Sequence, residues 1–336
     1  SVTLDGTTGN YDCHSVGTNT VVLIVTDVFG NADSCIANVT VQDTVPPVAL
    51  CNDITVSLDA NGQAQITASD IDAGSSDNCA IASVTLDGNV GDYDCDSVGV
   101  NTVTLIVTDV NGNSDSCTAN VTVQDTIAPV ALCNDITVTL DANGQAQITA
   151  SDIDAGSSDN CAIASVTLDG NVGDYDCDSV GVNTVTLIVT DVNGNADSCT
   201  ANVTVQDTVP PVALCNDITI SLDGNGQAVI TASDIDAGSS DNCNLASVTL
   251  DGTTGNYDCD SVGTNTVVLI VTDVFGNADS CVANVTVQDT VPPVALCNDI
   301  TVSLDANGQA QITASDIDAG SSDNCTIASV TLDGNV

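Results

Sequence analysis

Aspartate carries the most evident chemistry in this chain, because it gathers in tight groups on stretches that are typical of loops. Asp70, Asp72 and Asp77 lie in "SDIDAGSSDNC" (69–79), and Asp109 and Asp115 lie in "DVNGNSD" (109–115). Hard oxygen ligands clustered on loops suit Ca²⁺, which takes six to eight of them. The alternative is that Asp and Asn form good turns and keep the surface soluble.

The predicted Ca²⁺ ligands include equivalent positions in later copies of the same segments. "SDIDAGSSDNC" occurs unchanged four times, whereas Asn111 is replaced by Phe29 and Phe275 in other copies and cannot be an obligatory ligand. The candidates are Asp43, Asp70, Asp72, Asp77, Asp109, Asp115, Asp152, Asp154, Asp159, Asp234, Asp236 and Asp241.

Cysteine is the second chemical feature, with 16 residues in the chain. A zinc thiolate site is disfavoured, because there is no CxxC pair and the single His14 stands where other copies have Asp. A small domain with a thin core commonly uses disulfides outside the cell. The predicted disulfide cysteines are Cys51, Cys79, Cys95, Cys117, Cys133, Cys161, Cys177, Cys199, Cys215, Cys243, Cys259 and Cys281.

Composition narrows the choice of partners. The 336 residues include no Lys, Arg, Met or Trp, and the formal charge is −46. Such a chain repels nucleic acid and anionic membranes and attracts cations. The 43% of hydrophobic residues predict buried strands rather than disorder, and no apolar run is long enough to cross a membrane.

The sequence repeats with a period of 82 residues, and each complete repeat holds four cysteines. The predicted organisation is the back half of one repeat, three complete repeats and the front half of another. Their ranges are 1–42, 43–124, 125–206, 207–288 and 289–336.

Each repeat reads as all-β. Apolar and polar residues alternate in 53–59 and 64–70, which the turn "ANGQ" would join as a hairpin. Further strands are expected at 81–87, within 92–98, at 101–109 and at 117–123, with no helical period. A seventh, short strand that crosses the sandwich is expected within 88–98. An even number of strands would return the chain to the end of the sandwich at which it entered.

The pattern "DTVPP…C.DITV…DNC…G.NTVTLIVTDVNGN…C.ANVTV" resembles hyalin repeats and related immunoglobulin-like modules, strung in tandem through large secreted surface proteins of Bacteroidota. The resemblance implies an array of β-sandwiches of the immunoglobulin or fibronectin III type, with a structural or adhesive role. In such sandwiches the first strand runs parallel to the last. Among the three possible pairings this favours Cys51–Cys117 with Cys79–Cys95, each closed within its own repeat. It also places 70–79 and 109–115 beside Asp43 at the entry pole, where a cation would lock neighbouring repeats.

Enzymatic constellations are missing from the sequence: no Ser, His and Asp set recurs, and no basic residue could orient an anion. The Asp-Ser/Thr-aliphatic triplets resemble an O-glycosylation motif of Bacteroidota, although an Asp- and Thr-rich chain also produces them by chance. They centre on Thr44, Thr126, Thr208, Thr290, Ser97, Ser179 and Ser261.

The sequence therefore predicts an extracellular structural or adhesive filament of disulfide-stapled, Ca²⁺-stiffened repeats. Its partners would be further copies of itself, divalent cations and surface glycans. The alternatives are an array of glycan- or protein-binding modules and an ice- or mineral-binding surface. The phrase "SVTLDG" opens the chain and recurs at 329–334, inside a repeat. We expect a segment of a longer repetitive chain, the other explanation being head-to-tail assembly of separate chains.

Overall fold

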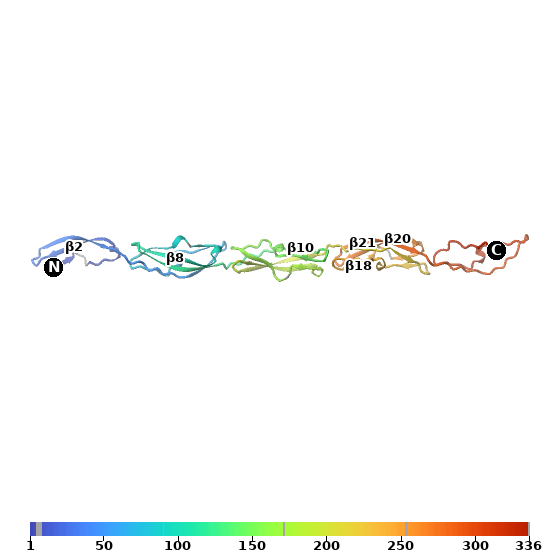
Figure 1. Ribbon diagram of the computed structural model, residues 1–336, viewed down its shortest axis with the longest axis horizontal. Helices are drawn as coiled ribbons and strands as arrows, with labels where there is room; N and C mark the ends of the chain where they lie inside the picture. Colours follow the sequence, from blue (N-terminus) through green and yellow to red (C-terminus); the bar gives the residue numbers. More distant parts are fainter. Residues whose placement is uncertain (5–8, 90, 171, 253–254, 335–336) are drawn as a thin grey trace. The chain divides into compact units, whose positions relative to one another are not determined.

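The computed structural model describes residues 1–4, 9–89, 91–170, 172–252 and 255–334. They form two compact units. One comprises Ser1–Cys133, Asp154–Thr167 and Thr186–Cys199, and the other comprises Asn134–Ile153, Leu168–Val185 and Thr200–Val336. Figure 1 labels representative strands along the chain.

The repeat 43–124 is a β-sandwich of one four-stranded and one two-stranded sheet. The larger sheet has the order β4-β9-β8-β6 and the smaller sheet pairs β5 with β7. The strands are β4 (Ile54–Ser57), β5 (Ala64–Gln65), β6 (Ile81–Leu86), β7 (Asp92–Tyr93), β8 (Gly99–Asp109) and β9 (Ser114–Gln124).

The first strand of the larger sheet, β4, runs parallel to the last, β9, with Ile54 opposite Val121. The pairs β9–β8 and β8–β6 are antiparallel. The parallel pairing of the first and last strands expected from the resemblance is therefore confirmed, and with it the immunoglobulin-like architecture.

Alternation along β8 and β9 builds the core. Side chains at every second position of these strands point to the same face of the sheet. Val103, Leu105 and Val107 of β8 are at most 3% exposed, and so are Ala119, Val121 and Val123 of β9. They pack with Leu58, which follows β4, and with Ile66, Ile71 and Tyr93.

Two local expectations are wrong. The segments 53–59 and 64–70 do not form a hairpin, because β4 pairs with β9 whereas β5 pairs with β7, and the turn between them carries the chain from one sheet to the other. The second segment also leaves the strand after Gln65. Thr67 and Asp70 form a capping box that starts the helix α1 (Ala68–Ile71).

The seventh segment of the sandwich lies elsewhere than expected. Among the described residues of 88–98, β7 is the one strand. The additional pairing involves 48–51, through isolated bridges from Val48 to Ser76 and from Cys51 to Asp72. In the sequence, Pro46 and Pro47 directly before this stretch argue against a strand, because proline cannot donate to a ladder.

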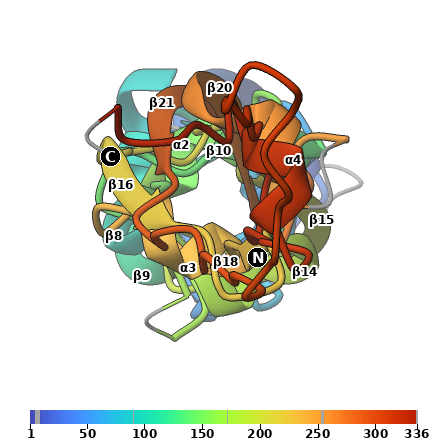
Figure 2. The same cartoon turned by 90° about the vertical axis from the view of Figure 1, so that its right-hand side faces the viewer.

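The other copies repeat these elements. Residues 125–206 contain β10 (Ile136–Thr139), β11 (Ala146–Gln147), α2 (Ala150–Ile153), β12 (Ile163–Leu168), β13 (Asp174–Tyr175), β14 (Gly181–Asp191) and β15 (Ala196–Gln206). Residues 207–288 contain β16 (Ile218–Ser221), β17 (Ala228–Val229), α3 (Ala232–Ile235), β18 (Leu245–Leu250), β19 (Asn256–Tyr257), β20 (Gly263–Asp273) and β21 (Ala278–Gln288). Helix α3 lies beside β18 in Figure 2.

The flanking segments contain only part of this set. Residues 1–42 form a three-stranded sheet of β1 (Val2–Leu4), β2 (Gly17–Thr26) and β3 (Ala32–Val41), and 289–336 contain α4 (Ala314–Ile317). Short 3₁₀ turns complete the chain: η1 (Cys13–Ser15), η2 (Asp87–Asn89), η3 (Cys95–Ser97), η4 (Cys177–Ser179) and η5 (Cys259–Ser261).

Candidate functional site: the repeat junctions

The disulfides fall into two classes that share one sequence separation of 66 residues. The first class closes a single repeat, as in Cys51–Cys117, which the resemblance implied. Its other members are Cys133–Cys199 and Cys215–Cys281. Each joins the start of one repeat to the last strand of the same repeat.

The second class joins successive repeats, so the expected pairing of Cys79 with Cys95 is wrong. Cys95 is bonded to Cys161 of the next repeat, and Cys79 is bonded to Cys13 of the preceding one. The same bond recurs as Cys177–Cys243 and Cys259–Cys325. The expectation that every cysteine is oxidised within its own repeat is therefore also wrong.

The reason is that Cys79 and Cys95 lie at opposite ends of their repeat. Cys79 immediately precedes β6 near Asp43, where the chain enters, whereas η3 begins at Cys95 beside the turn before β5 at the other end. Cys35 and Cys297 are exposed and unpaired.

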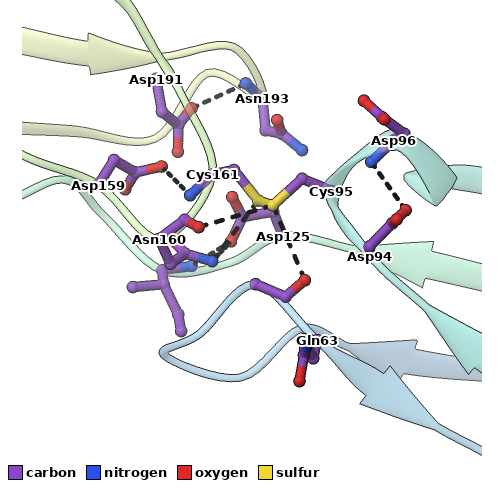
Figure 3. The surroundings of a disulfide bond; sticks show 12 residues. Gln63, Asp94, Cys95, Asp96, Asp125, Asp159, Asn160, Cys161, Asp191 and Asn193 are labelled. Atoms are coloured by element: carbon purple, nitrogen blue, oxygen red, sulfur yellow. Dashed lines mark hydrogen bonds between the residues drawn. A yellow bond between two sulfur atoms is a disulfide. The ribbon is translucent and has the colours of Figure 1, made fainter.

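Close backbone contact surrounds the junction disulfide (Figure 3). The amide Nδ2 of Asn160 donates to the backbone oxygen of Asp59 in the preceding repeat, at 3.3 Å. Gly62 has a positive φ of 71°, and a Cβ there would lie 2.6 Å from Cys95 Sγ and 2.8 Å from the Asn160 backbone oxygen. The glycine of the "ANGQ" turn therefore allows the next repeat to approach.

Three aspartates meet beside this disulfide. Asp125 comes from the linker after β9, Asp159 from the loop before β12 and Asp191 from the end of β14, and ligand atoms of the three lie within 4.8 Å of one another. Asp207, Asp241 and Asp273 form the same cluster one repeat later. At the first junction the corresponding group is Asp43, Asp77 and Cys79.

Asp191 is held ionised by its own hairpin turn. The residue is 2% exposed, and its carboxylate accepts hydrogen bonds from the backbone N–H groups of Asn193 and Asn195, each at 2.8 Å. Burial raises the pKa of Asp191, but the hydrogen bonds, led by that from the Asn195 side chain, outweigh it and leave the pKa below its ordinary value.

Asp125 is fixed from two sides. Its Oδ1 accepts from the Ile127 N–H at 3.1 Å and from Asn160 Nδ2 at 3.2 Å, and its backbone oxygen accepts from Asn195 Nδ2. The asparagines at 160 and 195 thus orient the linker, a role that the sequence analysis missed. Their signal was the unchanged Asn in every copy of "SSDNC" and "GN.D".

Several predicted cation ligands accept hydrogen bonds from backbone N–H or hydroxyl groups, and their role in cation binding stays a prediction. Asp70 Oδ2 accepts from the N–H and the hydroxyl of Thr67, which lowers its pKa. Asp72 accepts from the hydroxyl and the N–H of Ser75, which lowers its pKa as well. Asp115 accepts from the N–H of Ala49. Equivalent bonds hold Asp152, Asp154, Asp234 and Asp236.

The residues of the predicted glycosylation motif have two kinds of surroundings. The threonines at 44, 126, 208 and 290 are exposed. The serines at 97, 179 and 261 are half-buried, and each donates to the aspartate three residues earlier. Modification at any of them stays a prediction.

Comparison with known proteins gives no family assignment. No family description and no curated protein matches the chain. Among solved structures, a titin segment, domains I67–I69 in a mutated variant, is 9% identical over 73% of this chain and all of that one, with a TM-score of 0.35. Drosophila N-cadherin EC1–4 is 12% identical over 83% of this chain and 86% of that one, with a TM-score of 0.30.

A third similar structure, domains 1–4 of protocadherin gamma B7, is 13% identical over 82% of this chain, with a TM-score of 0.29. The chain's own strand order shows what it is. It is a tandem array of immunoglobulin-like repeats. Among the described residues, no helix has the length and apolar character needed to cross a bilayer.

Proposed function

We propose that the chain is part of an extracellular structural or adhesive filament whose repeats carry tension through a continuous disulfide ladder. The observation that carries this proposal is the overlap of the disulfide loops. Each of the seven bonds spans 66 residues, and each loop begins before the preceding one has closed.

The overlap creates two covalent tracks along the array. The junction track crosses from Cys13 to Cys79, follows the backbone for 16 residues to Cys95, and crosses again to Cys161. Within a repeat this track follows β6. The second track crosses from Cys51 to Cys117, follows β9 and the linker for 16 residues to Cys133, and crosses to Cys199.

The tracks limit how far the array can extend when its repeats unfold. Sixteen residues of fully extended backbone span roughly 55 Å, whereas a whole 82-residue period without disulfides spans about 280 Å. An oxidised filament would thus lose its folded structure under load without lengthening greatly. Such a limit is useful in a fibre and has no evident use in an isolated binding domain.

Disulfides persist in oxidising compartments, and this supports the extracellular location that we propose. The resemblance to hyalin repeats makes a bacterial cell surface the source that we propose, with O-glycans on the exposed threonines. Ca²⁺ and surface glycans are the non-protein partners that we propose.

Further repeats of the same kind are the proposed protein partners. In the sheet of residues 1–42, Val25 is 48% exposed, whereas its equivalent Val107 is fully buried under the front half of its own repeat. Leu304 in 289–336 is 68% exposed, whereas its equivalent Leu58 is 3% exposed. In the complete repeat 43–124 the two positions lie in one core, where residues from both halves of the repeat pack together.

Single-molecule stretching of residues 1–336 tests the proposed function. Through the junction track the shortest covalent path follows about 70 residues and four disulfides, which gives a maximum extension of about 260 Å when every repeat is unfolded. The fully reduced chain should reach about 1,100 Å. An oxidised chain that extends in steps of a whole repeat would contradict the proposal.

A further inference from the structure

Three oxygen atoms at the second junction are buried without a hydrogen-bond partner: Asp125 Oδ2, Asp159 Oδ1 and Asn160 Oδ1. Asp125 as a whole is 8% exposed. A buried acceptor without a donor costs about 1–3 kcal/mol, and more when it is charged. Three such atoms at one junction, where ligand atoms of Asp125, Asp159 and Asp191 lie within 4.8 Å of one another, indicate that a positively charged group belongs beside them.

The chain itself cannot supply that group. It contains no Lys or Arg, its single His, His14, lies in a 3₁₀ turn far from residues 125–191 in the sequence, and the N-terminal amine of Ser1 donates to the Thr26 backbone oxygen. The other carboxylate of the cluster, Asp191, has both of its oxygens engaged as acceptors by the hairpin turn, so it adds negative charge and no proton donor.

We propose that each of these junctions binds one hard divalent cation of the Ca²⁺ class. At the second junction its protein ligands are the carboxylates of Asp125, Asp159 and Asp191 with the side-chain oxygen of Asn160. Asp207, Asp241 and Asp273 with Asn242 form the equivalent site. Their free oxygens are Asp207 Oδ2, Asp241 Oδ1 and Asn242 Oδ1.

Three carboxylates and an amide oxygen are the ligands that Ca²⁺ prefers, and water would complete its six to eight contacts. This inference specifies the cation partner of the proposed function and otherwise stands on the junction geometry alone.

The first junction shows how such a site can be closed. There Asn111 Nδ2 donates to Asp43 Oδ2 at 3.2 Å, and Asn78 Nδ2 donates to Asp43 Oδ1 at 3.3 Å. The atom that is free in Asp125 and Asp207 is therefore occupied in Asp43. The place of Asn111 is taken at the third junction by Phe275, whose side chain has no donor, and at the second junction by Asn193, which leaves Asp125 Oδ2 without a hydrogen bond. We expect two binding sites in residues 1–336 and weaker binding at Asp43.

A bound cation would join three segments at the entrance to a repeat. Asp125 lies on the linker, Asp159 in the loop that holds the junction disulfide, and Asp191 at the end of β14 (Figure 3). Asn160 also contacts Asp59 of the preceding repeat. The cation would therefore fix the linker on the repeat that follows and, through Asn160, restrict movement at the junction.

Calorimetric titration of Ca²⁺ into the oxidised, metal-stripped 1–336 chain tests this inference. We expect two saturable sites, with Asp125→Asn and Asp207→Asn each removing one and the double variant removing both. Asn has the same size as Asp, and its side-chain oxygen can still accept the hydrogen bond from the Ile127 N–H. The matched control is Asp96→Asn, which removes an equal charge on the other side of the same disulfide, at a position where another copy carries His14.

Melting temperatures with and without Ca²⁺ give a second readout. The Ca²⁺-dependent increase should be reduced in each single variant, absent in the double variant and unchanged in Asp96→Asn. Weak, unsaturable binding that is equal in all variants would mean condensation on an acidic surface and would overturn the inference. The inference would also be overturned if the site bound a proton instead of Ca²⁺. In that case the melting temperature would depend on pH but would not respond to Ca²⁺. The extension limit of the oxidised chain does not depend on Ca²⁺, so the two proposals can fail separately.

Discussion

Removing one disulfide from each class separates the stability of a repeat from the extensibility of the array. The perturbation is Cys95→Ser with Cys161→Ser, and the matched control is Cys51→Ser with Cys117→Ser. Both bonds close loops of 66 residues, so the chain-entropy treatment gives each a stabilisation of about 4 kcal/mol. Chemical denaturation should therefore show losses of similar size in the two variants.

Extension should differ between them. Without Cys95–Cys161 the shortest covalent path from Cys79 runs back along the backbone to Cys51 and crosses the disulfide to Cys117. It then follows the backbone to Cys133, crosses the disulfide to Cys199 and runs back to Cys177. This detour adds about 34 residues, or about 115 Å of maximum extension. Without Cys51–Cys117 the junction track is untouched, and the limit should stay where it is.

Force spectroscopy of the unfolded, oxidised variants measures both limits directly. Equal lengthening in the two variants, or none in either, would refute the ladder, because only one of the two bonds lies on the shortest path. Both cysteines of a pair are replaced by Ser, because a remaining free thiol could exchange with another disulfide while the chain is being stretched.

Three further outcomes follow from the same geometry. Gly62→Ala and Gly74→Ala each place an alanine at a positive φ, which costs roughly 1–2 kcal/mol of folding free energy. Gly74 faces open space, so Gly62→Ala should be the more destabilising in thermal melts, and equal losses would contradict close contact at the junction. Ala60→Lys creates a single trypsin site in a chain without Lys or Arg. Cleavage there should leave one covalent piece on unreduced gels and release residues 1–60 after reduction, whereas release without reductant would disprove the overlap. Hydrogen bonds lower the folded-state pKa of Asp70, so its stabilisation is present above the ordinary value of 3.8 and is lost as the pH falls through the lower folded value. Acid denaturation in Asp70→Asn should be shallower below about pH 4 than in the parent chain, and identical curves would exclude this contribution.

The sequence located the strands of the larger sheet but not their partners. Strands lie within or across the expected segments 53–59, 81–87, 101–109 and 117–123, because a buried face and an exposed face leave a period of two in a half-buried strand. The expected segments 64–70 and 92–98 contain only the two-residue strands β5 and β7. The turn at 60–63 satisfied every local criterion for a hairpin, yet β4 and β5 entered different sheets. Local turn chemistry reports a reversal of the chain and not which strands pair after it.

The disulfide error has a related cause. Pairing Cys79 with Cys95 assumes that a repeat with four cysteines is closed on itself, so that the loop before 81–87 is clamped to the short strand that folds back on it. The separation of 66 residues that fits Cys51–Cys117 also fits Cys95–Cys161. A periodic sequence presents such a partner in the next copy as readily as in its own, so the recurrence of that number was the available signal.

The aspartate groups show where side-chain identity stops being informative. In "TASD" and "DAGS" a hydroxyl residue lies three positions from an aspartate, a spacing that allows local hydrogen bonds, and Asp70 and Asp72 form them. In "SSDNC" the aspartate has no such hydroxyl partner. Asp159 Oδ2 accepts from the Cys161 N–H, and Asp159 Oδ1 is buried without a hydrogen-bond partner. The difference depends on Asp125 and Asp191, which lie 34 and 32 positions away in the sequence.

The two proposed devices would act on different deformations of the array. The overlapping disulfides limit the extension of the array after its repeats have unfolded. In the folded array, however, the linker can turn about the single disulfide at a junction, so that bond does little to restrict bending. A cation shared by Asp125, Asp159 and Asp191 would restrict the linker in the folded state, and it would be lost when the repeat unfolds because its ligands come from three separate segments. The glycine at position 62 favours both, since it lets Asn160 approach the preceding repeat closely enough to hold the disulfide on one side and Asp125 on the other. One 82-residue unit can thus encode resistance to bending and a limit to stretching with the same junction residues.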